Sequence, residues 1–67
     1  MEVKQKEVEG ELWDFIDRGN IAEIINHETK QRPKNQKQFI RDMGYSVSTD
    51  PKEMNTHQAV RMVMSDL

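Results

Sequence analysis

The two histidines of this sequence are the first candidates for chemistry, as potential metal ligands. His27 and His57 each have acidic residues nearby in the chain. Two histidines and a carboxylate can hold zinc when the helices that carry them meet. Neither histidine, however, belongs to an H-E-x-x-H or E-x-x-H pattern. We therefore expect two surface histidines, no metal and no other cofactor.

No other side chains have a spacing that favours catalysis. The serines lack the glycine-flanked turn that presents a nucleophile, and no glycine-rich phosphate loop occurs. A chain of 67 residues also buries too little surface to build a water-poor, concave site. The sequence thus predicts a protein that is not an enzyme and has no small-molecule substrate.

A short cationic segment is the clearest charge feature. Residues 30–41 contain five basic residues and no acid, although the whole chain has a net charge of −2. These basic residues are Lys30, Arg32, Lys34, Lys37 and Arg41. The segment has two interpretations: a solvated helix end attracted to the protein's own acidic helices, or a patch that contacts phosphates. The second would make the chain a DNA- or RNA-binding transcriptional regulator, acting as a dimer.

Residues 39–46 share some features with the opening of a helix-turn-helix unit, namely apolar residues, a turn glycine and a following serine. Aligning Gly44 with the turn glycine places Ile40 where a small residue is needed. It also places Asp50 and Glu53 at positions that should be apolar. We therefore infer no helix-turn-helix unit and assign no family.

Apolar side chains indicate a protein partner more strongly than the charges indicate a nucleic acid. Trp13 is flanked by acidic residues at the margin of an apolar stripe, as interface anchors often are. Methionines supply adaptable apolar surface. The predicted partner-binding residues are Trp13, Phe15, Met54, Met62 and Met64. We expect a regulatory protein, an inhibitor or adaptor, that occupies the surface of a protein partner and also forms a homodimer.

Short helices are the elements expected to position these residues. Val8, Leu12, Phe15 and Ile16 have the spacing of one helical face, and Ile21, Ile24 and Ile25 that of a second. Gly10 interrupts the first helix, so residues 1–9 are expected to fray or to form a separate turn. Gly19 is expected to end this helix, and Asn20 to cap the next, which ends before Pro33.

Two further helices are expected in the second half of the chain. The first of them starts after Asn35 and ends at Gly44. Residues 45–49 form an extended connector with Tyr45 and Val47 turned inward. The last helix begins at Asp50, where Asp-Pro and Glu53 form a strong start signal, with a break near Asn55 and Thr56.

The predicted fold is therefore all-α, a small bundle of three to four short helices with no sheet, in one domain spanning residues 1–67. No apolar run is long enough for a membrane span or a secretory signal, and there is no cysteine. The expected compartment is the cytoplasm, with no contact with a membrane.

Overall fold

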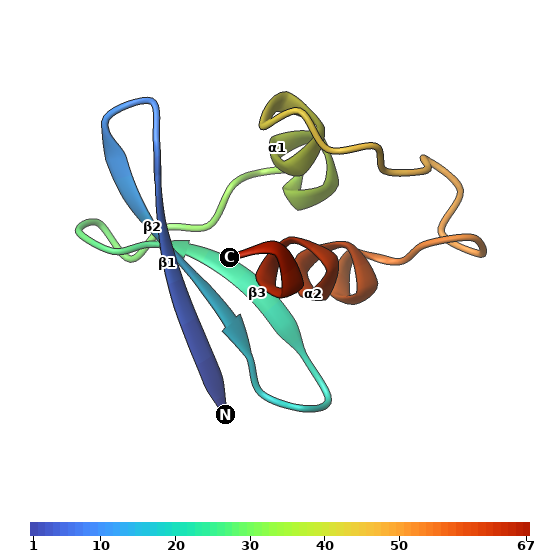
Figure 1. Cartoon of the computed structure of the whole chain (residues 1–67), viewed down its shortest axis with the longest axis horizontal. Helices are drawn as coiled ribbons and strands as arrows, with labels where there is room; N and C mark the ends of the chain where they lie inside the picture. Colours follow the sequence, from blue (N-terminus) through green and yellow to red (C-terminus); the bar gives the residue numbers. More distant parts are fainter.

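A computed structural model describes all residues, 1–67. Three strands are followed by two helices. The elements are β1 (Glu2–Val8), β2 (Glu11–Asp17), β3 (Ala22–Asn26), α1 (Gln36–Asp42) and α2 (Thr56–Asp66). The strands form one antiparallel sheet in the order β1-β2-β3, as Figure 1 shows.

This architecture shows that the predicted all-α bundle is wrong. The strands within the first 26 residues form a sheet and only the second half of the chain is helical, so the fold is α+β. The apolar residues of the first half match a helical period but also alternate along a strand. Trp13 and Phe15 alternate with Leu12, Asp14 and Ile16, and strands favour aromatic and β-branched residues of this kind. Residues 2–8, which were expected to fray, pair with β2 along their whole length.

The turn between β1 and β2 explains why Gly10 is not a flaw in a helix. Val8 pairs with Glu11, so Glu9 and Gly10 form a two-residue hairpin loop. Both have positive φ, 51° and 81°, which defines the type I′ turn that matches the twist of antiparallel strands. Gly19, expected to end a helix, lies instead in the loop between β2 and β3.

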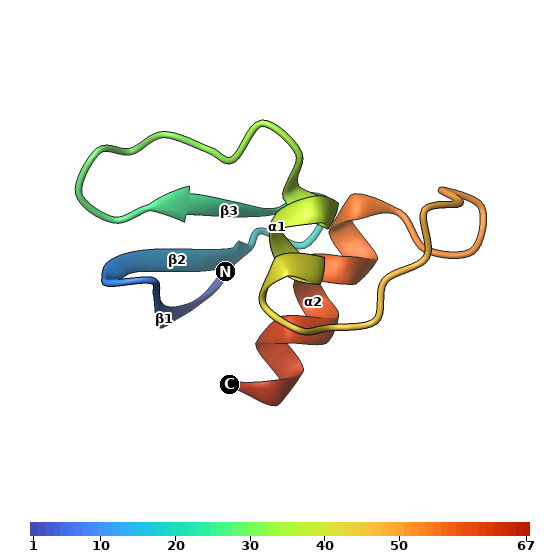
Figure 2. The same cartoon turned by 90° about the horizontal axis from the view of Figure 1, so that it is seen from above.

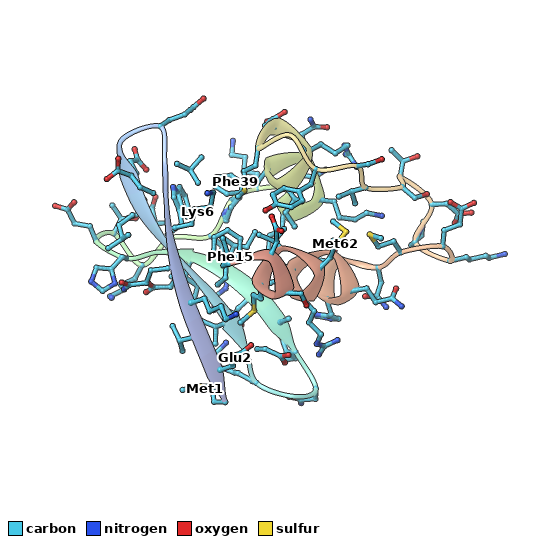
Figure 3. All side chains as sticks on the ribbon, in the orientation of Figure 1. Met1, Glu2, Lys6, Phe15, Phe39 and Met62 are labelled. Carbon is cyan, nitrogen blue, oxygen red and sulfur yellow. The ribbon has the colours of Figure 1, made fainter.

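Both helices pack against the same face of the sheet, and the opposite face carries no helix (Figure 2). The core lies between these two layers. In Figure 3, Phe15 points from β2 into this interior, toward α2. The buried core residues are Phe15, Ala22, Ile24, Ile40, Val47, Ala59, Val60, Val63 and Met64.

The prediction for α1 is confirmed. Asn35 caps its first turn, since its side chain accepts a hydrogen bond from the Gln38 N–H, and Ile40 is buried. Gly44 follows the helix with a φ of 102°, a conformation that suits glycine after a helix end. The connector prediction also holds, because Val47 is buried and Tyr45 packs against the core.

The last helix starts later than its strongest sequence signal indicated. Asp50 forms only an isolated turn, in which its carbonyl accepts from the N–H groups of Glu53 and Met54. The actual cap of α2 is Asn55, which exchanges hydrogen bonds with Gln58 in a capping box. The predicted break near Asn55 is thus the true beginning of the helix.

Neither helix combines the length and the apolar character that a membrane-crossing segment requires.

Candidate protein-binding face

The sheet face opposite the helices is the open face of this protein. Its residues are Val3, Gln5, Glu7, Leu12, Asp14, Ile16, Glu23, Ile25 and His27, assigned from the strand register and the alternation of side chains. Three cross-strand rows result. Val3 lies beside Ile16, Gln5 beside Asp14, and Glu7 beside Leu12. Glu23 and Ile25 of β3 complete the first two rows, and His27, which follows β3, completes the third by donating its N–H to the Leu12 carbonyl.

An apolar stripe crosses this face diagonally. We define it by Val3, Ile16, Ile25 and Leu12, which occupy adjacent or diagonal positions on the three strands. Ile16 is buried although it lies outside the core cluster. Val3 and Leu12 are 47% and 39% exposed. The stripe therefore offers apolar surface that the protein's own helices do not cover.

A polar network lies beside the stripe. Asp14 Oδ1 accepts a hydrogen bond of 3.0 Å from Gln5 Nε2, and Asp14 Oδ2 lies 3.0 Å from His27 Nδ1. Partial burial opposes ionisation of Asp14, but the hydrogen bonds and the charges of His27 and Lys30 outweigh it. The pKa of Asp14 consequently lies below its ordinary value of 3.8. The carboxylate is thus held ionised in a defined orientation.

Glu23, in the row of Val3 and Ile16, is clamped by two arginines. Its carboxylate oxygens each lie 2.6 Å from one guanidinium, that of Arg18 and that of Arg32. Because both partners are partly exposed to solvent, the clamp contributes modestly to stability. The clamp holds the Glu23 carboxylate on the open face, opposite Ile16.

A shallow pocket of about 630 Å³ opens at the hairpin end of the sheet. Leu12 and His27 belong to both the pocket and the open face, and the carboxylates of Glu7, Glu11 and Glu28 line it. Glu11 accepts a hydrogen bond from the buried Asn26 side chain. One end of the apolar stripe is therefore bordered by acidic groups.

The structure does not gather the predicted partner-binding residues on one exposed surface. Phe15 and Met64 lie in the core, with 0% and 2% exposure. Trp13, Met54 and Met62 are half-buried and pack against that core. Trp13 lies on the helix side of β2, where its ring is 4.7 Å from that of Phe39 between centroids. It joins the sheet to α1.

Three residues of the cationic segment are engaged within the molecule. Arg32 pairs with Glu23. Lys37 Nζ donates to the Met54 carbonyl at 2.7 Å, and Arg41 Nη1 donates to the Val47 carbonyl at 3.4 Å. Lys30 and Lys34 make no side-chain hydrogen bond. The segment mainly ties the loop before α1, and α1 itself, to the rest of the protein.

The two histidines lie at opposite ends of β3. His27 directly follows the strand, and His57 Nδ1 lies 3.2 Å from the N–H of Ala22 at its start. No group of three or more histidine, cysteine or acidic side chains is placed to hold a metal ion.

Sequence reasoning missed the open face because it assigned a helix to these residues. A usable signal was present. Glu9-Gly10 separates two segments of seven residues, and the second alternates clearly, with Trp13 and Phe15 on one side and Leu12, Asp14 and Ile16 on the other. A turn containing glycine between two such segments is typical of a hairpin.

The fold and this face define a small α+β protein whose sheet is covered by helices on one side only. Comparison of the chain with protein-family models, with curated proteins and with solved structures finds no match.

Proposed function

We propose that this chain is a small non-enzymatic regulatory protein that binds a protein partner through the open face of its sheet. The observation that carries the proposal is the apolar stripe. Val3 and Leu12 stay about half exposed on a face that has no covering layer, while the core on the other face is complete. Apolar surface on a sheet face, bordered by polar residues, is typical of protein interaction sites.

The surroundings of the stripe define the chemistry of the partner. A partner surface that covers Leu12 must contribute apolar side chains. At the hairpin end it also meets the carboxylates of Glu7, Glu11 and Glu28. Basic side chains beside the apolar contact would complement this border and speed association at low salt. The partner is therefore a protein surface that combines apolar and basic residues.

A binding role also accounts for the polar network. The His27 ring nitrogen faces Asp14, and no hydroxyl side chain hydrogen-bonds to it. The three side chains that form the network satisfy one another, as is expected of groups that orient an interface. We infer that they fix the position of the partner rather than transform a substrate.

The test compares two substitutions of the same kind at similarly exposed leucines. Leu12→Gln removes the exposed leucine at the hairpin end of the stripe and leaves the net charge unchanged. Leu67→Gln is the matched control, since Leu67 is 37% exposed and lies at the end of α2 on the other side of the sheet. Tagged proteins are used to capture partners from nuclease-treated extract of the source cell.

We expect one or more proteins to be retained by the wild type and by Leu67→Gln but not by Leu12→Gln. With the captured partner purified, Leu12→Gln should weaken binding tenfold or more, because burying one leucine is worth about 1.5–3 kcal/mol. Equal retention by all three proteins would contradict the proposal. A parallel capture from untreated extract separates the alternatives, because retention that appears there and is lost after nuclease treatment would instead support the nucleic-acid alternative.

A further inference from the structure

The two outer edges of the sheet differ. At β3, every backbone N–H that points away from β2 has an acceptor. Ala22 donates to His57 Nδ1 at 3.2 Å, and Ile24 donates to Gln36 Oε1 at 3.1 Å. Asn26 donates to the carbonyl of Gln31 at 2.8 Å. The chain between β3 and α1 runs back along this edge (Figure 2). The β3 edge is therefore closed.

The outer edge of β1 is open. The N–H groups of Ala22 and Ile24 point away from β2, so these residues do not bond to β2. In an antiparallel register their β2 partners, Asp17 and Phe15, therefore direct their N–H and C=O groups toward β1. The even-numbered β1 residues Glu2, Lys4 and Lys6, which lie opposite Asp17, Phe15 and Trp13, therefore form the backbone hydrogen bonds to β2. The odd-numbered ones, Val3, Gln5 and Glu7, direct N–H and C=O groups outward, and these groups have no partner within the molecule.

An open edge of this length is a template for another strand. The even-numbered β1 side chains, which share the sheet face with the helices, restrict which strand can pair. Two β1 strands related by a two-fold axis can be centred on any residue. Centring on Glu2, Lys4, Lys6 or Glu7 opposes a charge to its own copy. Centring on Gln5 opposes Lys4 to Lys6 twice, and centring on Val8 opposes Glu7 to Glu9 twice. Like charges directly opposite one another are unfavourable.

One register escapes this conflict. When Val3 lies opposite Val3 of a second copy, Glu2 of each chain lies opposite Lys4 of the other, so two pairs of unlike charge form. Glu2 is at the exposed end of β1 in Figure 3. The outward-pointing residues also face one another, which allows regular antiparallel hydrogen bonds. Every register centred on a residue keeps this backbone geometry, so it is the charge pairing that selects the register centred on Val3.

We propose that two copies of this chain pair through β1, antiparallel and centred on Val3, to form a continuous six-stranded sheet. The pairing is isologous, as most homodimer interfaces are. Val3 belongs to the apolar stripe and neighbours Ile16. The two stripes therefore meet across the two-fold axis, and the dimer has one extended apolar face instead of two separate ones.

The first experiment determines the register with single cysteines, which is direct because the chain has none of its own. In the dimer Val3→Cys lies opposite its copy, with Cα atoms about 5.5 Å apart, within the range of a disulfide. Gln5→Cys is the control. In this register Gln5 lies opposite Met1 of the other copy, so the two Gln5→Cys residues are four residues, about 13 Å, apart along the strands.

Under mild oxidation we expect Val3→Cys to form a covalent dimer at least ten times faster than Gln5→Cys. Faster linkage of Gln5→Cys would overturn the register, and equal slow linkage of both would overturn the pairing.

The second experiment removes one outward N–H. Val3→Pro lacks this donor but keeps every bond from β1 to β2, because proline is tolerated on a strand edge that faces outward. Val3→Thr keeps the N–H and the branched shape. Sedimentation of the purified proteins should show dimers for wild type and Val3→Thr and monomers for Val3→Pro, with unchanged circular dichroism.

A wild type that stays monomeric at about 1 mM overturns the proposal. Leu12→Gln should remain dimeric, so a failed partner capture and a failed dimer are separate outcomes.

Discussion

Asp14 is the residue on which the polar network of the open face depends. It accepts a hydrogen bond from Gln5 and pairs with His27. Its pKa lies below the ordinary 3.8. A carboxyl whose pKa is lower in the folded than in the unfolded state stabilises the fold at pH values above 3.8, and this contribution disappears as the pH falls through the folded-state pKa.

We therefore expect Asp14→Asn to lower the free energy of unfolding at pH 7 by less than about 1 kcal/mol, since His27 is half exposed. The difference from wild type should shrink as the pH falls to about 3. Urea denaturation at both pH values measures it. Glu28→Gln is the control, because the Glu28 side chain makes no hydrogen bond. A difference for Asp14→Asn that is the same at both pH values would be evidence against this coupling.

At the scale of elements, the start of α2 shows how two competing local signals were resolved. Asp50 accepts a hydrogen bond from the Lys52 N–H within an isolated turn. Asn55 caps the helix itself, with Gln58 completing the capping box. The segment 50–54 lacks apolar residues at the spacing needed to pack a further helical turn on the core, and helices depend on such packing more than on their start signals.

Replacing Asn55 with alanine should lower the free energy of unfolding by about 1 kcal/mol, because the first turn of α2 loses its capping side chain. Asp50→Ala should cost less than about 0.5 kcal/mol, as is usual for a surface substitution. Chemical denaturation of both variants measures the comparison. A larger loss for Asp50→Ala would indicate that the helix starts at Asp50.

At the scale of the whole molecule, Trp13 joins the sheet to the helical half. Its ring is tilted by 57° relative to that of Phe39, a favourable aromatic arrangement. The sequence predicts that Trp13 is an anchor for a protein partner. With the ring half-buried between β2 and α1, Trp13→Ala should instead destabilise the fold by about 2–3 kcal/mol.

A double-mutant cycle of Trp13→Ala and Phe39→Ala isolates this contact. We expect a coupling energy of about 0.5–1.5 kcal/mol, measured from the unfolding of the four proteins. Additive losses would show that the two rings do not stabilise each other.

Leu12→Gln, on the other face of β2, should leave the free energy of unfolding within about 0.5 kcal/mol of wild type.

The candidate binding face could be predicted only in part. The hairpin is indicated by the alternating residues around Trp13 and Phe15 and by the Glu9-Gly10 turn. The helical spacing of Val8 and Ile16 competes with that alternation over the same residues. Nothing in the local sequence places Val3 next to Ile16, since their proximity follows from pairing along the whole hairpin.

The sequence by itself determined the local features of the second half: α1 with its cap at Asn35 and its end at Gly44, and the inward Val47. Their hydrogen bonds and apolar spacing lie within a few residues of one another. The sheet was decided only by the tertiary structure, because a strand has no hydrogen bonds of its own and forms when a distant segment supplies them. That same requirement leaves the outer edge of β1 open.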